Sequence, residues 1–288
     1  MDYLIHILII FSIYGILAMS LNLLVGYTGL LSAAHAAFYG LGAYASALIL
    51  TKAHLPFIFA LCVGIIFPMI VAVLIGIVLS RFKDDYYVLA SLGLNVIVSG
   101  IILNAQDLTN GSLGIAGIMR PKIFGFVLTS NQSFLIFAFV FLILTYLLSR
   151  FIARSSFGRA LKAIREDEKS LSIFGYKTHM FKLVIFVITA GLAGLAGVMY
   201  ASYITFIDPA TFIVPESIFV LSMIILGGLA NTEGAIIGAL FLIILPEALR
   251  FVGFPADVAG QLRQVVYGVL LVLFMLFRPQ GIRGEYKL

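Results

Sequence analysis

The chain has 288 residues, 62% of them apolar, with 18 basic and 13 acidic side chains and a formal net charge of +5. Soluble domains are typically about 45 to 50% apolar and about 25% charged, whereas 11% of these residues are charged and the mean hydropathy is +1.15. These values exclude a water-soluble globule. Since a membrane-spanning helix needs ~20 mostly apolar residues, the apolar residues suffice for roughly nine spans.

Apolar runs separated by polar residues predict about nine membrane-spanning helices, some of them short or broken. The runs lie at residues 3–25, 31–51, 56–80, 87–103, 134–152, 183–207, 217–229, 235–249 and 265–277. The chain lacks the alternating segments of a transmembrane barrel. The first run follows Asp2 rather than a basic segment and is too long for a usual signal peptide, so we interpret it as a retained span. The predicted fold is therefore all-α, a polytopic integral membrane protein with one domain over residues 1–288.

The basic residues predict the orientation, because helical membrane proteins carry their excess Lys and Arg on cytoplasmic loops. If the segment 153–182 faces the cytoplasm, nine alternating spans put 13 of the 18 basic residues inside and 5 outside. The inside residues are Arg81, Lys83, Arg150, Arg154, Arg159, Lys162, Arg165, Lys169, Lys177, Lys182, Arg278, Arg283 and Lys287. We therefore expect an outside N-terminus and an inside C-terminus, and membrane topology rather than nucleic-acid binding explains the positive charge.

Two longer polar segments interrupt the otherwise short connections. Residues 104–133 are rich in Gly, Asn and Ser and are predicted to be extracytoplasmic, whereas residues 153–182 are charged and predicted to be cytoplasmic. Loops longer than ~12 to 15 residues are usually functional. Each half of the chain also carries a Gly-interrupted segment, around Gly26 and around 227–234. Transporters often build their pathway from such broken segments, although simple Gly-capped helix ends are the alternative.

The cytoplasmic segment contains a predicted short amphipathic helix that ends near Gly175. Leu161, Ile164 and Leu171 recur close to helical spacing, so they share one face. The helix either rests on lipid headgroups or docks its apolar stripe into a groove of a cytoplasmic partner, and we favour docking. The residues assigned to this docking role are Gly158, Arg159, Leu161, Ile164, Arg165, Glu166, Leu171 and Gly175.

Polar side chains inside the apolar runs are candidates for the translocation pathway, namely Asn22, His35 and Asn95. Polar groups at membrane depth are costly and usually face a cavity or a partner. For His35, a structural hydrogen bond between helices is slightly favoured over substrate contact. Small residues at helical spacing predict close packing of helices. These sets are Ala36, Gly40, Ala43 and Ala47; Gly191, Gly194 and Gly197; and Gly234 with Gly238.

Motifs for hydrolysis or metal binding do not occur in the sequence. There is no G-x-x-x-x-G-K-[ST] phosphate loop and no H-E-x-x-H. The histidines His6, His54 and His179 are scattered, and Cys62 is the only thiol. We therefore expect a protein that is not an enzyme and that binds no metal or cofactor of its own.

Four stretches carry a family resemblance: residues 20–44, residues 158–175, the turn from Gly227 to Gly238, and the tail 267–281, which ends in Arg-Pro-Gln-Gly. Together they resemble the branched-chain amino acid permeases of ABC importers, specifically the LivM-type member of the permease pair. The likeness covers nearly the whole chain, and the inner loop and the tail are its most specific parts. Residues 230–233 depart from the Gly-Thr-like turn that is usual in the family.

The resemblance implies the ABC importer permease fold and a multi-pass location in a bacterial cytoplasmic (inner) membrane, in contact with lipid. It implies four partners: a second permease, two cytoplasmic ATP-binding subunits that use the ATP, and an extracytoplasmic substrate-binding protein. It also implies that the inner loop is the coupling segment and that the cargo is leucine, isoleucine or valine.

Other readings stay open. Related permeases carry urea, short amides or other amino acids. A secondary transporter or channel would work without ATPases but would be expected to use central carboxylates, which are few here. An intramembrane enzyme that uses His35 with Asp208 or Asn95 is the least favoured reading.

Overall fold

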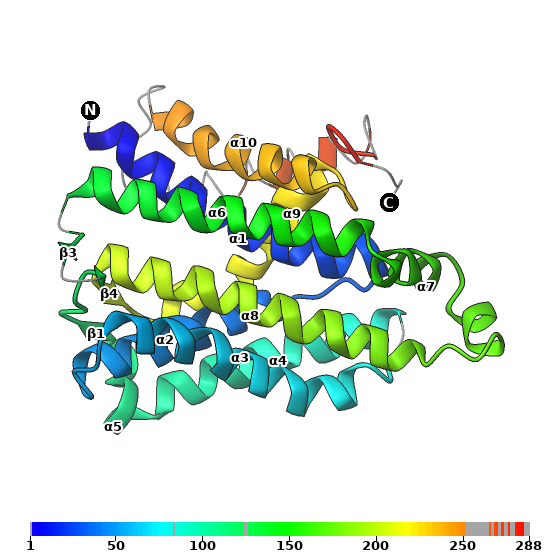
Figure 1. Cartoon of the computed structure of the whole chain (residues 1–288), viewed down its shortest axis with the longest axis horizontal. Helices are drawn as coiled ribbons and strands as arrows, with labels where there is room; N and C mark the ends of the chain where they lie inside the picture. Colours follow the sequence, from blue (N-terminus) through cyan, green and yellow to red (C-terminus); the bar gives the residue numbers. More distant parts are fainter. Residues whose placement is uncertain are drawn as a thin grey trace.

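In the computed structural model, long helices run side by side in an elongated bundle (Figure 1). The structure describes residues 2–82, 84–123, 126–128 and 130–250, and in the C-terminal part residues 265, 268, 269, 272, 273, 276 and 280–284. The elements are α1 (Asp2–Thr28), α2 (His35–Thr51), α3 (Phe57–Leu79), α4 (Asp84–Asn104), α5 (Gln106–Thr109), η1 (Gly111–Leu113), β1 (Ile115–Ala116), β2 (Lys122–Ile123), β3 (Phe126–Val127), α6 (Asn131–Arg154), α7 (Ser156–Ile173), α8 (Thr178–Ile204), β4 (Phe206–Ile207), η2 (Pro209–Phe212), α9 (Val214–Gly227) and α10 (Thr232–Arg250).

The prediction of an all-α, multi-pass membrane protein is confirmed. Among the described residues, α1, α3, α4, α6 and α8 are each long and apolar enough to cross a membrane. The helices α9 and α10 pass the same test only as a pair that is bent by 120°, and α2 has 17 residues. Eight of the predicted runs thus coincide with helices, but not all of these helices are full crossings. Most of the ninth run, 265–277, lies outside the described residues.

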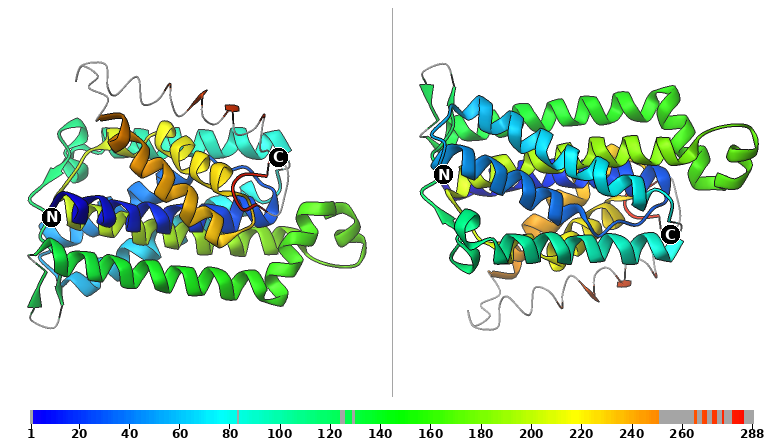
Figure 2. Two further views of the ribbon diagram at one scale, coloured as in Figure 1. Left: turned by 90° about the horizontal axis from the view of Figure 1, so that it is seen from above. Right: turned by 90° about the horizontal axis from the view of Figure 1, so that it is seen from below.

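The two ends of the bundle differ. Strands β1 and β4 and helix α5 lie at one end, which we call the strand end, and α7 projects from the other, the α7 end (Figures 1 and 2). At the strand end, β1 pairs antiparallel with β4, with Ile115 opposite Ile207. The Lys52 ammonium donates to the Asp107 carbonyl oxygen (2.6 Å). From the charge distribution, we expect the α7 end to face the cytoplasm.

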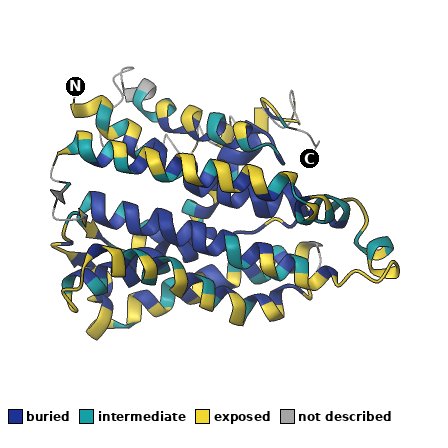
Figure 3. Cartoon of the chain, viewed as in Figure 1, coloured by how far each residue is buried: buried dark blue, intermediate teal, exposed yellow. Residues whose placement is uncertain are grey.

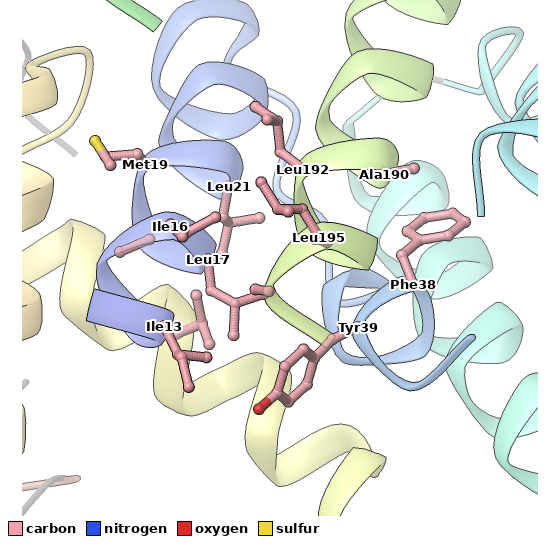
Figure 4. Packing of buried hydrophobic residues seen from close by; sticks show 14 of the residues in the cluster. Ile13, Ile16, Leu17, Met19, Leu21, Phe38, Tyr39, Ala190, Leu192 and Leu195 are labelled. Carbon is pink, nitrogen blue, oxygen red and sulfur yellow. The ribbon is translucent and has the colours of Figure 1, made fainter. Parts of the chain in front are cut away.

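Helices α1 and α8 form the centre of the bundle (Figure 3). A helix that is apolar on all sides belongs in the interior, and α1 is buried over most of its length beyond Ile9. Figure 4 shows Leu17 of α1 and Leu192 and Leu195 of α8 between these two helices, with Tyr39 of α2 nearby. Helices α3, α4 and α6 instead expose large apolar side chains along their outer faces, which suits contact with lipid.

Close helix packing by small residues, as predicted, is confirmed. A Cβ added to Gly42 of α2 would overlap the backbone of Gly194 in α8, and one added to Gly194 would overlap the backbone of Gly64 in α3. A Cβ on Gly238 of α10 would overlap the Met223 carbonyl of α9. Glycine at these positions lets the helix backbones touch, which is why α2, α3 and α8 form one tight layer.

Candidate functional site

The segment between α1 and α2, residues 29–34, is not helical, and most of it is buried. Its backbone finds partners on α4: the Ala33 N–H donates to Ser91 Oγ (3.0 Å), and the Asn95 amide donates to the Ala33 carbonyl (3.1 Å). Irregular backbone at membrane depth is tolerated where neighbouring protein groups satisfy it. The side chains of α4 therefore hold a broken segment inside the bundle.

A second irregular segment, residues 205–213, precedes α9. Asp208 caps its short helix η2 by accepting from the Thr211 N–H (2.9 Å). The Phe212 carbonyl accepts a hydrogen bond from Ser99 of α4 (3.3 Å). Helix α4 thus holds both broken segments.

The first turns of α2 and α9 meet within the bundle. Ser217 Oγ of α9 accepts hydrogen bonds from the Ala36 N–H of α2 (2.9 Å) and from the Asn95 amide (3.1 Å). All three residues are buried. Because the N-terminal end of a helix is electropositive, two such ends side by side favour a negative group at this point.

His35 lies beside this meeting point and is buried. Its Nε2 is 2.6 Å from Ser20 Oγ of α1, and Ser20 also donates to the Leu17 carbonyl. His35 thus forms a hydrogen bond between α2 and α1, as expected if its role is structural.

Asn22 binds a different segment from His35 and Asn95. It fastens α1 to the turn between α9 and α10, since its Oδ1 accepts from the Ala230 N–H (3.0 Å) and its Nδ2 donates to the Asn231 carbonyl (2.8 Å). Ala230 has a φ of 59°, a left-handed conformation that favours glycine. In the described part of the chain, Asn22, His35 and Asn95 make no hydrogen bonds with one another, and each is bonded to other groups of the chain.

Replacing Asn95 by leucine is expected to lower the free energy of unfolding by about 1 to 2 kcal/mol, because it removes a donor from the buried Ala33 carbonyl. A thermal melt of the detergent-solubilised protein should show a midpoint lower by about 2 to 8 °C. Asn104→Leu is the matched control, since Asn104 is exposed and donates to the Gly100 carbonyl of its own helix. Equal midpoints for the two variants would contradict the assigned role of Asn95.

Helix α7 is broken at Asp167, whose backbone is not helical (φ −155°, ψ 94°). Ser155 caps the first part by accepting from the Gly158 N–H (3.1 Å). Asp167 caps the second part by accepting from the hydroxyl (2.5 Å) and the N–H (3.1 Å) of Ser170. These hydrogen bonds lower the pKa of the Asp167 carboxyl below its usual value, so the cap stays ionised at neutral pH.

The apolar stripe of α7 faces this chain's own bundle. Leu161 is 0% exposed and Ile164 is 4% exposed. The expectation that these two residues enter a groove on a partner is therefore wrong. An amphipathic stripe predicts that a face is buried, but not which surface covers it. The other predicted coupling residues differ in exposure. Gly158 is buried, Arg165 and Leu171 are half-buried, and Arg159, Glu166 and Gly175 are exposed.

Polar contacts fix both parts of α7 to the bundle. In the first part, the Arg165 guanidinium donates to the Gly26 carbonyl of α1, and the Lys162 ammonium lies 5.4 Å from the centre of the Tyr27 ring. In the second part, Glu168 pairs with the buried Lys182 of α8 (2.7 Å). Sequence reasoning missed the Glu168–Lys182 pair, because residues 14 positions apart share no local pattern.

Large apolar side chains are exposed at the tip of α7, which we define as Ile173, Phe174 and Tyr176. Ile173 is 83% exposed and Phe174 is 79% exposed, and Figure 3 shows this outermost part of α7 as largely exposed. Large apolar side chains that project from a bundle mark a surface for interaction. In the sequence, this surface could have been identified from the adjacent apolar residues Ile173 and Phe174, which directly precede Gly175.

Part of the C-terminal tail, residues 282 and 283, binds to the ends of α9 and α10. The N–H groups of Ile282 and Arg283 donate to the Leu226 and Gly227 carbonyls (both 2.9 Å) and so cap the end of α9. Arg283 pairs with Glu233 of α10 (2.5 Å). Of the predicted Arg-Pro-Gln-Gly motif, the first two residues lie outside the described part of the chain.

A multi-pass bundle with broken helices that meet in its interior, and with a helix that projects from one end, has the architecture of a membrane transport permease. The family comparison gives the same class. Residues 3–275 match the model of the family described as branched-chain amino acid transport system, permease component. The chain belongs to this family.

Individual relatives agree with the family match. The chain is 31% identical to the high-affinity branched-chain amino acid transport system permease protein LivM of Escherichia coli strain K12, over 94% of this chain and 67% of the relative. It is 28% identical to BraD of Pseudomonas aeruginosa and 28% identical to LivH of Salmonella typhimurium, each over 95% of this chain and 92% of the relative. No solved structure matches this chain.

Proposed function

We propose that this chain is a permease subunit of an ATP-driven importer of branched-chain amino acids in the bacterial inner membrane. The observation that carries the proposal is the family match over residues 3–275. The names of the relatives, which describe permease proteins of branched-chain amino acid transport systems, support the same cargo. A second permease would complete the pathway, and a substrate-binding protein would deliver the amino acid at the strand end.

The meeting point of α2 and α9 is the proposed region of substrate passage. Leucine, isoleucine and valine each carry a carboxylate, and discontinuous helices in transporters point their N-termini at such groups. We assign Asn22, His35 and Asn95 a positioning role. They hold the unwound segments whose rearrangement would open the pathway alternately to each side.

The tip of α7 is the proposed docking surface for the cytoplasmic ATPases, which use the ATP. Ile173 and Phe174 would fill an apolar groove on that partner. Movement of the tip would reach the bundle through the anchored part of α7, where Arg165 holds the Gly26 carbonyl. One α1 turn earlier, Asn22 holds the Ala230 turn, so α7 is connected by hydrogen bonds to both α1 and the α9–α10 turn.

Co-purification tests this assignment. Changing Ile173 and Phe174 together to aspartate should reduce the ATPase subunits recovered with this chain at least tenfold, since charged groups cannot enter an apolar groove without loss of affinity. The matched control changes Leu113 and Met119 to aspartate. These residues are 81% and 61% exposed and belong to the segment at the opposite end. This control should keep the ATPases.

Loss of the ATPases from the control variant, or full retention by the Ile173/Phe174 variant, would overturn the docking assignment. Both variants change only exposed residues, so both should elute as single species from a size-exclusion column. That elution separates a lost interface from a lost fold.

A further inference from the structure

A basic cavity of about 320 Å3 opens at the α7 end, between α6, α7 and the turn that joins α9 to α10. Its lining includes four cationic side chains, Arg150, Arg154, Lys162 and Arg283, and one carboxylate, Glu233. Glu233 lies 2.5 Å from Arg283. The charge of the lining therefore favours an anionic ligand.

The two arginines of α6 also border an apolar depression on the outer face of that helix. This second space, about 390 Å3, is lined by Leu147, Arg150, Phe151, Arg154 and Ser155. Leu147 is 55% exposed and Phe151 is 73% exposed. The same two cations thus connect a polar cavity to an apolar surface.

Neither arginine has a carboxylate partner among the described residues. Arg150 donates to the Tyr146 hydroxyl (3.1 Å) and lies 6.0 Å from the centre of that ring. The Arg154 guanidinium has no hydrogen-bond or ionic partner in the described part of the chain. Guanidinium groups bind phosphate oxygens strongly because they can donate two parallel hydrogen bonds.

We propose that the C-terminal end of α6 binds an anionic phospholipid, with its phosphate at Arg150 and Arg154 and an acyl chain along Leu147 and Phe151. An amphipathic anion matches both halves of the surface, whereas free phosphate matches only the basic cavity. Basic pockets at the cytoplasmic ends of membrane helices bind such headgroups. Exposed Leu144 and Leu148 continue the apolar surface along α6 away from the α7 end.

The lipid would lie at the junction that supports α7. Lys162 of α7 lines the basic cavity together with Arg150 and Arg154, so a bound phosphate would be shared between α6 and α7. This binding does not depend on which substrate is transported.

The test measures lipid retained by the full chain, purified with its partner subunits from vesicles of phosphatidylcholine and phosphatidylglycerol and analysed by native mass spectrometry. The wild type should retain phosphatidylglycerol in preference to phosphatidylcholine. Each change, Arg150→Gln or Arg154→Gln, should weaken retention about fivefold, since a basic residue at an anionic surface contributes about 1 kcal/mol. The double change should weaken it roughly 25-fold.

Two controls keep the result interpretable. Arg81→Gln removes an exposed arginine that lines neither cavity and that is predicted to lie on the same side of the membrane, so it should leave retention unchanged. Arg150→Lys with Arg154→Lys keeps both charges and should keep most of the lipid even if the glutamine variant folds poorly.

Three outcomes would overturn the proposal. Equal retention of phosphatidylglycerol by the wild type and the double glutamine variant would mean that the arginines do not bind it. Displacement of the lipid by excess inorganic phosphate would assign the cavity to a free anion. If the double glutamine variant lost the ATPase subunits but kept its lipid, the surface around Arg150 and Arg154 would be a protein interface instead.

Discussion

Replacing Gly194 by leucine is expected to prevent stable assembly of the bundle. A side chain there would overlap the Gly64 carbonyl and meet the Pro68 ring, so α3 and α8 could not keep their present separation. Overpacking a core usually costs about 1 to 3 kcal/mol, and a clash with backbone cannot be relieved by a rotamer change, so we expect more than about 3 kcal/mol. The variant should be absent from the monodisperse fraction after solubilisation.

Gly100→Leu is the matched control. Gly100 lies in α4, and among the described residues no other helix comes within 4 Å of a Cβ built there. The same substitution should therefore be tolerated, with a thermal midpoint close to that of the wild type. If the Gly194 variant matched the Gly100 variant in yield and midpoint, the close approach of α3 and α8 would be incorrect.

Changing Leu161 to aspartate is expected to detach α7 from the bundle. Leu161 is 0% exposed, and an unpaired carboxylate at a buried site is among the largest single-residue penalties. The expected cost is roughly 3 to 5 kcal/mol, by analogy with an uncompensated buried charge. Limited proteolysis should then cut the chain within residues 153–182, which the wild type should resist.

Ile173→Asp is the comparison that separates the anchor of α7 from its tip. Ile173 is 83% exposed, so its stability change should stay within about 0.5 kcal/mol, and the protease pattern should match the wild type. The reverse result, with a stable Leu161 variant and an unstable Ile173 variant, would mean that the buried face of α7 has been assigned to the wrong side.

The helices could be predicted because continuous apolar runs are a strong signal. The run 56–80, for example, is the helix Phe57–Leu79. The predicted run 31–51 contains a break that hydropathy alone does not show, since α2 begins at His35. Ala33 is unwound because Ser91 and Asn95 of a distant helix satisfy its backbone. Local sequence contains no record of such partners.

For the site residues, too, local features could be predicted from the sequence, whereas distant partners could not. Gly194 and Gly238 were predicted as packing positions, and their backbones do touch neighbouring helices. Leu161 and Ile164 were assigned to a partner because an apolar stripe looks alike whether it meets another subunit or the same chain. Asn22 could be identified as unusual from its apolar surroundings, but its partner, the turn at Ala230, lies 208 residues away.

Uptake of labelled leucine into proteoliposomes is the decisive test of ATP-driven import by this chain. The vesicles would contain this chain with the second permease, and the binding protein would be supplied on the opposite side from the ATPases. Uptake would be compared with and without the ATPase subunits, and with and without ATP on the cytoplasmic side of the membrane. We expect uptake only when the ATPases and ATP are both present, with competition by isoleucine and valine and none by urea. Equal leucine uptake without the ATPases, driven by an ion gradient or by leucine's own gradient, would contradict it.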